Sequence, residues 1–506
     1  MKHSKKWFTS LFKRRIQVAI LLLLQILFIA FLIMSGSNYL AISMSLSIIS
    51  FFVALHVLAK NDRSAYKLTW LFLILLFPLF GGLFYLLFKF QSSTRKFAKK
   101  LDNIDKKNKE MFFLPGDNKN NSDVPLINYL EKYNNYPCYD KTAVNYLESG
   151  EVMFEQLLEQ LNKAEKYIFL EFYIINEGKM WNSVLKILKK KASNGVEVKV
   201  ICDDMGCLFL LPNNFVNEMN SYGIKCTVFN PFRPLLTSVQ NNRDHRKIVV
   251  IDGKVAFTGG INLADEYINL YDRCGHWKDA GIMLTGKAAW SFTLMFLQMW
   301  MIATNDNLDC FKYYPWSNEK CSISSKGYVQ PYADSPMDRE NISEYVYLNI
   351  INNSKKYVYI NTPYLIIDEN MILALTMASK SGVDVRILVP YKWDKRLVHF
   401  TTKSYYRTLI KAGVKIYEYS PGFVHSKSFV SDDKVAVIGT ANLDFRSLYL
   451  NFECGACLYD VECIHNMKKD FLDSIKISKE ISIDDCKNNF FVRILQDFCR
   501  LFAPLM

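Results

Sequence analysis

The residues best suited to chemistry form one short motif that occurs twice in this 506-residue chain. The motif has the spacing H-x-K-x4-D, and in each copy a turn of small residues that ends in asparagine follows it. One copy alone is a weak signal, because an ordinary strand with polar ends has the same composition. The recurrence at matched offsets predicts a single active site built from both copies. The residues are His245, Lys247, Asp252 and Asn262 in the first copy and His425, Lys427, Asp432 and Asn442 in the second.

The local pattern predicts how one motif folds. The β-branched run Ile248–Ile251 is typical of a buried strand, and Asp252-Gly253 is a hairpin-turn signal. Residues two apart on a strand face the same side, so His245 and Lys247 point together. Asp252 lies an odd number of steps from His245. We therefore expect Asp252 to bind backbone or supporting groups, and not the substrate.

Two imidazoles and two ammonium groups around one phosphate favour a two-step transfer. One histidine attacks phosphorus and forms a phosphohistidine. The other protonates the leaving alcohol and then deprotonates the incoming one. The lysines and the two asparagines, Asn262 and Asn442, bind the phosphate oxygens. Near the motifs there is no acidic cluster of the kind that holds magnesium, so the prediction is an enzyme with no metal and no cofactor.

The distribution of charge indicates the class of partner. The net charge is +13, and all of this excess lies in the first 110 residues, while the remainder of the chain is neutral. A nucleic-acid enzyme carries its basic residues around the site, so we expect no nucleic-acid partner. Basic residues beside apolar segments instead suit anionic lipid headgroups. The sequence does not indicate the oligomeric state.

The N-terminal residues 1–90 are predicted to be a membrane segment with two to three apolar helices. The runs Ile16–Met34, Leu40–Ala59 and Leu68–Phe88 are each close to the ~20 residues that a spanning helix needs. Pro78, Gly81 and Gly82 are able to break the third run into a re-entrant or interfacial hairpin. The prediction is a multi-pass protein of the cell membrane.

The side of the membrane that carries the active site is left open by conflicting basic flanks on the apolar runs. Twelve cysteines without framework spacing favour a reducing compartment, and thus slightly the cytoplasmic side. The one C-x-x-C, Cys454–Cys457, has no partner pair at zinc-ribbon spacing and is interpreted as two strand cysteines.

The rest of the chain contains an internal repeat. Lys166–Tyr173 resembles Lys356–Tyr364, and in both halves the order is strand, helix, strand, helix, strand, catalytic hairpin. The predicted fold class is therefore α/β, with two similar α-β-α halves related by a pseudo-twofold axis that brings the two motifs together. The predicted boundaries are a basic polar linker at 91–130, halves at 131–325 and 326–485, and an amphipathic helix at 486–506. That helix is expected to lie either on the membrane surface or packed on the domain.

The paired motifs resemble the phospholipase D superfamily, and the fuller resemblance, over roughly residues 40–506, is to bacterial cardiolipin synthases. Its halves would be phospholipase D-like. The resemblance implies that two phosphatidylglycerol molecules become cardiolipin and glycerol, with phosphatidylglycerol and membrane lipids as partners. Alternatives are a phospholipase D or phosphatidyltransferase that uses another alcohol, and a non-enzymatic membrane scaffold. The supporting segments are Leu76–Gly82, Asp265–Tyr267, His276–Asp279, Gly439–Ser447 and Asn451–Glu453.

The resemblance also implies roles for single residues. His245 would be the nucleophile and His425 the acid and base, although the residues themselves allow the reverse. Asp279 and Glu453 would hold the imidazoles in the right tautomer, and the alternative for this pair is a structural salt bridge. The chain departs from the family pattern at Thr440, usually serine, at Met299, usually an acid, and at Ile367, usually proline.

Overall fold

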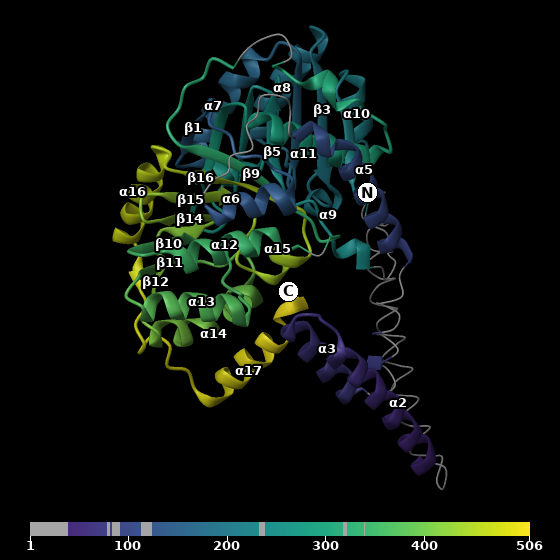
Figure 1. Cartoon of the computed structure of the whole chain (residues 1–506), viewed down its shortest axis with the longest axis vertical. Coiled ribbons are helices and arrows are strands. Elements are labelled where there is room, and N and C mark those ends of the chain that lie inside the picture. The colour runs from purple at the N-terminus through teal and green to yellow at the C-terminus, as the bar shows by residue number, and fades with distance from the viewer. Residues whose placement is uncertain are drawn as a thin grey trace. The chain divides into compact units, whose positions relative to one another are not determined.

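The computed structural model describes residues 39–77, 81–82, 85, 92–112, 124–231, 238–316, 321–338 and 340–505 (Figure 1). These residues belong to two compact units. One unit takes in the described residues up to 96, with 238–241 and 501–505, and the other takes in the described residues from 97 to 231 and from 242 to 500. We call them the N-terminal unit and the catalytic unit.

The longest helices among the described residues of the N-terminal unit are α2 (Tyr39–Ala59) and α3 (Ser64–Leu76). Helix α3 ends where Phe77 leaves the helical conformation, at φ −129° and ψ 74°. The next residue is Pro78, and a residue before proline is disfavoured in helical geometry. The predicted run Leu68–Phe88 is therefore not one continuous helix.

In the part of the chain that the structure describes, no helix has both the length and the apolar character to cross a membrane. The run Ile16–Met34, which was predicted as the first apolar helix, lies outside the described residues.

Part of the predicted linker at 91–130 is helical and contacts the core of the catalytic unit. Residues 92–112 form helix α5 (Ser92–Phe112), and Phe97, Leu101 and Ile104 pack against the core of the catalytic unit. Lys100 Nζ also donates to the carbonyl oxygen of Ile302 at 2.6 Å. The segment is polar in composition, but its few apolar residues recur at helical spacing, and this periodicity is what gives it a buried face.

Two mixed sheets form the framework of the catalytic unit, and their strand orders match position by position. The first sheet has the order β1-β8-β6-β5-β2-β3-β4, and the second has β9-β16-β15-β14-β10-β11-β12, extended at its edge by β17. Strands β2, β3 and β4 are parallel, as are β10, β11 and β12. This matching order confirms two similar α/β halves.

The first sheet consists of β1 (Thr142–Leu147), β2 (Tyr167–Phe172), β3 (Glu197–Asp203), β4 (Lys225–Phe229), β5 (Lys247–Ile251), β6 (Val255–Gly259) and β8 (Gly281–Gly286). The second consists of β9 (Tyr328–Asp334), β10 (Tyr357–Asn361), β11 (Asp384–Pro390), β12 (Lys415–Tyr419), β14 (Ser428–Ser431), β15 (Val435–Gly439), β16 (Glu453–Tyr459) and β17 (Lys479–Glu480).

The repeated helices predicted from the sequence are present, and others were not anticipated. Helices α8 and α13 follow β2 and β10, as expected, and α14 precedes β12. The bounds of the helices of the catalytic unit, short ones included, are α6 (Pro125–Tyr129), α7 (Gly150–Lys163), α8 (Lys179–Ser193), α9 (Asp204–Cys207), α10 (Phe215–Ser221), α11 (Ala289–Thr304), α12 (Ile342–Asn353), α13 (Glu369–Lys380), α14 (Arg396–Lys411), α15 (Phe445–Tyr449), α16 (Cys463–Lys476) and α17 (Phe490–Leu501), the last with its final residue in the N-terminal unit.

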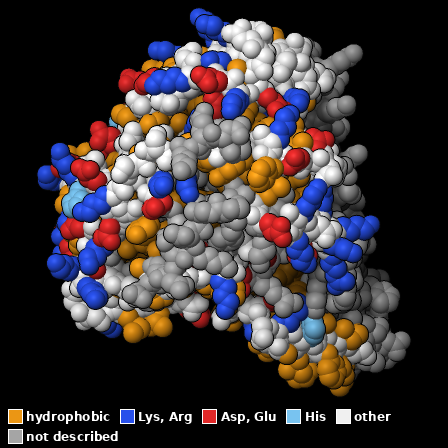
Figure 2. All heavy atoms as spheres, turned by 45° about the horizontal axis from the view of Figure 1, so that its top comes forward, with side chains coloured by type: hydrophobic (Ala, Val, Ile, Leu, Met, Phe, Trp, Pro, Cys, Tyr) orange, Lys and Arg blue, Asp and Glu red, His pale blue; other side chains and the backbone are white. Residues whose placement is uncertain are grey.

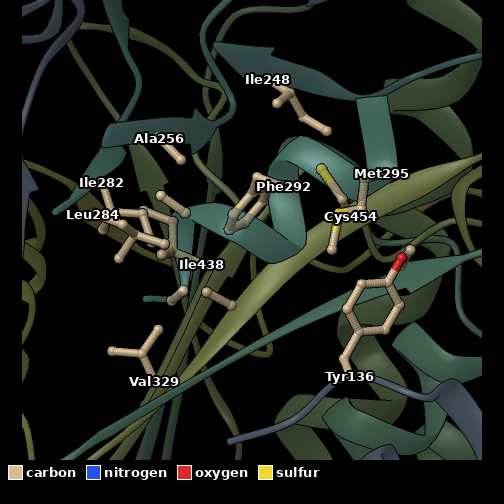
Figure 3. Close-up of a cluster of buried hydrophobic side chains, with 14 of the residues drawn as sticks. Tyr136, Ile248, Ala256, Ile282, Leu284, Phe292, Met295, Val329, Ile438 and Cys454 are labelled. Carbon is tan, nitrogen blue, oxygen red and sulfur yellow. The ribbon is translucent and has the colours of Figure 1, made fainter. Parts of the chain in front are cut away.

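Helix α11 is buried on all sides, which is the expected behaviour of a helix whose residues are apolar all round. Figure 3 shows its Phe292 and Met295 among side chains of both sheets, such as Ile248 from β5 and Ile438 from β15. The two halves therefore share one core. Cys454 and Cys457 lie buried and unbridged in β16, which confirms their interpretation as strand cysteines.

Candidate active site

The two motifs meet through a reciprocal exchange of short strands. The chain before His425 forms β13 (Gly422–Val424), which pairs in parallel with β7 (His276–Lys278) of the first half. In the same way, Asp244 forms a parallel bridge with Phe452 of the second half. The backbone N–H of His245 donates to the carbonyl oxygen of Phe452 at 3.0 Å, and that of His425 donates to Lys278 at 2.7 Å. The backbone of each histidine is therefore held by a hydrogen bond to a residue of the other half.

This exchange gives each histidine a carboxylate from the opposite half. His245 Nδ1 lies 2.9 Å from both carboxylate oxygens of Glu453. His425 Nδ1 lies 2.6 Å from Asp279 Oδ2. Both carboxylates are fully buried. Because each Nδ1 faces a carboxylate, Nε2 is the ring nitrogen available for chemistry in each histidine.

Additional donors hold Glu453 in place. Thr440 Oγ1 donates to Glu453 Oε2 at 2.6 Å, and Asn451 Nδ2 lies 3.3 Å from Oε1. Threonine has the same hydroxyl as the serine that is usual at position 440 in the family that the chain resembles, so this departure preserves the contact. The residue that orients the histidine is itself oriented, which is how precise sites are supported.

The two lysines lie close to the histidines. Lys247 Nζ donates to the carbonyl oxygen of His245 at 2.6 Å, and Lys427 Nζ lies 2.8 Å from His425 Nδ1 and also binds the carbonyl oxygen of His425. Burial lowers the pKa of Lys247 to about 8 and that of Lys427 to about 7, despite the nearby carboxylates. Both ammonium groups are buried and lack a direct carboxylate contact among the described residues, which suits them to bind an anionic substrate.

The histidines are held neutral. Burial lowers the pKa of His245 to about 4 and that of His425 to about 3, and the lysines of both motifs add to this shift. Burial alone would raise the pKa of Asp279 and Glu453, but the contact with the adjacent histidine and the positive charge of the adjacent lysine outweigh burial, so both pKa values are lowered. The site therefore combines neutral imidazoles with ionised carboxylates, and a neutral imidazole is the nucleophilic form.

Asp252 and Asp432 lie in the hairpin turns, away from the histidines. Asp252 accepts the backbone N–H groups of residues 165 to 167 at 2.7–2.8 Å, and Asp432 accepts those of residues 355 to 357 at 2.7–2.9 Å. Both adopt positive φ, 52° and 54°. The expectation that Asp252 binds backbone is confirmed. Each aspartate ties the catalytic hairpin to the start of the neighbouring central strand.

The two asparagines differ from each other. Asn262 Oδ1 accepts from the backbone N–H of Ile174 at 3.0 Å, and its Nδ2 donates to Tyr267 Oη at 2.7 Å. Asn442 Nδ2 lies 3.4 Å from Asp444 Oδ2, and its buried Oδ1 has no hydrogen-bond partner among the described residues. The phosphate-binding role of both asparagines stays a prediction.

Two tyrosines that sequence reasoning missed line the site. The ring of Tyr173 packs edge-on against His245 at 5.0 Å, and Lys247 Nζ lies 5.7 Å from its centre. Tyr267 packs edge-on against His425 at 5.4 Å. Both tyrosines come from the first half, and each packs against a different catalytic histidine. A signal was present, because each tyrosine closes one of the sequence segments that belong to the repeat or the resemblance.

Among the described residues, no group of three or more histidine, cysteine or acidic side chains is arranged to hold a metal ion. Figure 2 shows basic and acidic side chains interspersed on the face that it draws, and not one broad basic surface. The basic groups nearest the histidines are the buried side chains of Lys247 and Lys427.

Two halves with matched sheets that contribute one histidine each define a phospholipase D-like catalytic unit. The family model described as "Cardiolipin synthase, PLD-like domain" matches residues 157–279 and 347–475, and "Phospholipase_D-nuclease N-terminal" matches residues 48–89. Among solved structures, phosphatidylserine synthase of Haemophilus influenzae has a TM-score of 0.56 at 16% identity, covering 75% of this chain and 97% of that one, which supports the fold.

Relatives that are similar over most of the chain identify the family more closely than the fold does. A cardiolipin synthase of Geobacillus kaustophilus is 35% identical and covers 92% of this chain and 93% of its own length. Cardiolipin synthase 2 of Bacillus anthracis is 34% identical and covers 90% of both chains. A Streptococcus mutans protein described only as uncharacterized is 42% identical over 87% of this chain and 96% of its own length. The chain belongs to the cardiolipin synthase family.

Proposed function

We propose that this protein is a cardiolipin synthase, which transfers a phosphatidyl group between two phosphatidylglycerol molecules and releases glycerol. The observation that carries the proposal is the crossed pair of histidine–carboxylate contacts, His245 with Glu453 and His425 with Asp279. Two imidazoles held in this way supply a nucleophile and a proton carrier to one phosphorus atom. Two buried lysines supply the positive charge that a phosphodiester requires.

The reaction proceeds in two balanced steps. In the first, Nε2 of one histidine attacks phosphorus, the bond from phosphorus to the glycerol headgroup oxygen breaks, and that oxygen takes a proton from the other histidine. In the second, a headgroup hydroxyl of another phosphatidylglycerol gives its proton back to that histidine and attacks phosphorus, and the P–N bond breaks. Following the family resemblance, His245 is assigned as the nucleophile and His425 as the acid and base.

The low pKa of His425 in the free enzyme has to rise before this residue can carry a proton. A bound phosphodiester adds negative charge to the site, which favours protonated imidazole. The same charge favours protonated Lys247 and Lys427. Substrate binding and the protonation state needed for the first step therefore support each other. Asn262 and Asn442 are assigned to the phosphate oxygens, with one N–H of each amide turned toward the substrate.

The proposal also assigns the protein to a membrane. Its substrates are membrane lipids, the apolar runs near the N-terminus provide the means to hold it in the cell membrane, and the family model at residues 48–89 falls on that region. A multi-pass arrangement is part of the proposal, with the basic residues between and beside the runs at the headgroup level.

The test uses the purified full chain in detergent with phosphatidylglycerol alone. We expect cardiolipin and glycerol in equal amounts, without nucleotide or added metal. His245→Ala and His425→Ala are each expected to abolish transfer, and His465→Ala, which changes a histidine outside the site, is the matched control. Phosphatidic acid as the sole product would indicate hydrolysis and contradict the proposal. After a quench in denaturant at alkaline pH, which preserves the acid-labile P–N bond, mass spectrometry of the peptide that carries the phosphatidyl group identifies the nucleophile.

A further inference from the structure

We propose that helix α17 lies on the surface of the lipid bilayer, with its row of large apolar side chains buried among the lipids, and thereby holds the catalytic unit next to its substrate. This inference rests on the proposed function for the lipid nature of the substrate. The row, which we call the apolar face of α17, consists of Phe490, Phe491, Ile494, Leu495 and Phe498.

The apolar face is exposed, and this fact decides between the two placements that the sequence allowed for this helix. Phe491 is 79% exposed, and Phe498 is 51% exposed. At about 100° per residue, the five side chains fall within one arc of roughly 140°. A helix packed on the domain through its apolar side would bury that arc. Five large apolar side chains exposed side by side on one helix are typical of an interaction surface.

The helix is held to the catalytic unit by a different and less apolar edge. The contact with another element is made by Arg500, whose guanidinium lies 4.7 Å from the ring centre of Tyr405 in α14. On the same edge Gln496 and Cys499 are buried, and Asn488 Nδ2, just before the helix, donates to Gln496 Oε1 at 3.2 Å. The position of α17 is therefore set by contacts that leave the apolar arc turned outward. Because the less apolar edge makes the contacts with the protein, the more apolar face is left exposed to a separate binding partner.

The residues at the C-terminal end of α17 identify the occupant. Leu501, the last residue of the helix, belongs to the N-terminal unit, where its carbonyl oxygen accepts from Thr69 Oγ1 of α3 at 2.7 Å. The ring of Phe502 packs edge-on against Phe72 of α3 at 5.7 Å. Phe498 is only three residues before this anchor, about 4.5 Å along a helix. The apolar face is thus continuous in the chain with the unit that the proposed function assigns to the membrane.

The chemistry of the helix fits a bilayer surface better than a second protein chain. Three of the five exposed apolar residues are phenylalanine, and basic residues Arg493 and Arg500 lie on the opposite side, with a single acid, Asp497. This combination of an apolar face with a basic polar side is the pattern of helices that lie in the headgroup region of anionic membranes. A second copy of the chain is the competing occupant, and measurements on two physical forms of the lipid separate the two.

The test compares Phe491→Glu/Phe498→Glu with Phe311→Glu in the full chain. Phe311 is 49% exposed, so it matches Phe498, but it lies on another surface. Transfer is measured with phosphatidylglycerol in vesicles and with dispersed short-chain phosphatidylglycerol. We expect the double variant to lose at least about tenfold in rate on vesicles, which corresponds to about 1.4 kcal/mol, and to stay within about twofold on the short-chain lipid. Phe311→Glu should change neither rate.

Three results would overturn the inference. One is an unchanged rate on vesicles. Another is an equal loss on both lipid forms, which would mean that the helix only supports the fold. The third is conversion of a dimer to a monomer with vesicle activity intact, which would assign the face to a second copy. If wild-type protein transferred no lipid, the proposed function would fail separately. Hydrogen exchange of residues 490–500 with and without phosphatidylglycerol vesicles would then still decide whether the helix docks, because docking slows exchange and its absence leaves exchange unchanged.

Discussion

The contact between His245 and Glu453 predicts the effect of one conservative substitution, Glu453→Gln. Both carboxylate oxygens lie 2.9 Å from Nδ1, and the carboxylate is fully buried. When Nε2 bonds to phosphorus, the imidazole becomes positively charged. A unit charge pair at this distance in an effective dielectric of about 20 is worth about 6 kcal/mol. The amide of glutamine recovers part of that through its dipole.

A net loss of about 4 kcal/mol in the transition state corresponds to a decrease of about 10³-fold in kcat. The measurement is the initial rate of cardiolipin formation from phosphatidylglycerol in detergent, with saturating lipid. Glu159→Gln is the matched control, since Glu159 is an exposed partner of Lys163 at 2.6 Å, and its substitution should leave kcat unchanged. Circular dichroism of both variants checks the fold.

The reasoning fails if Glu453→Gln retains more than a tenth of wild-type kcat. A large rise in KM with an unchanged kcat would also contradict it, because an orienting carboxylate acts on the reacting imidazole and not on lipid binding. The crossed arrangement adds a second requirement. Removing the Glu453 charge should lower the pKa of His245 further, since that charge raises it, whereas Asp279→Asn should act mainly on the pKa of His425. Histidine NMR signals of the two variants distinguish these effects.

Other residues of the site and of the core support four further predictions. Thr440→Ser should keep near wild-type activity, while Thr440→Val should lose about tenfold or more in kcat, because a hydrogen bond to a buried charge is worth about 1.5–3 kcal/mol. The pKa of Lys247 is lowered to about 8 and that of Lys427 to about 7, so kcat/KM should decrease as the pH rises through that range and the ammonium groups lose their protons. Asp432→Ala removes the acceptor of three backbone N–H groups at a residue with φ 54°, and should lower the free energy of unfolding by about 2 kcal/mol or more, with Asp432→Asn milder because asparagine tolerates positive φ. Phe292→Ala opens a cavity in the core that both halves share, and should cost about 3–5 kcal/mol in a denaturant titration.

Local patterns in the sequence predicted the catalytic hairpins and their repeat well. The strand before Asp252, the turn at Asp252-Gly253 and the strand after it are all present, with positive φ at both turn residues. These features depend on neighbours within a few residues, where β-propensity and turn chemistry act directly. The repeated order of strands was predicted from the same kind of pattern.

The crossed partners of the histidines were beyond such patterns. Glu453 is 208 residues from His245, and Asp279 is 146 residues from His425. Their contacts depend on the parallel pairing of β7 with β13 and on the bridge from Asp244 to Phe452. Neither pairing could be predicted from a turn or a periodic pattern in the sequence. The resemblance named the two carboxylates, and the structure adds which histidine each one contacts.

Helix α11 and helix α5 show two different reasons for missing an element. The residues of α11 are apolar on every side, so it lacks the one-sided period on which helix recognition depends, and its uniform apolarity instead indicates a helix enclosed by the core. Helix α5 has the period but little apolar content, and composition alone suggested a linker. The periodic spacing of apolar residues and their total number are separate signals in a sequence. A helix that has either one can be buried when the neighbouring layers provide a complementary surface.

The residues that break the symmetry of the site explain how two similar halves can supply two different histidines. Behind His245, Glu171, Asp244 and Arg246 are buried together, and burial raises the pKa of Asp244 to about 6. The equivalent positions in the second half are the uncharged Asn361, Val424 and Ser426. The proposed reaction uses one imidazole as the nucleophile and the other as the proton carrier. In the proposed mechanism the two histidines have different roles, and the charged residues buried behind His245 have no charged counterpart at the matched positions behind His425.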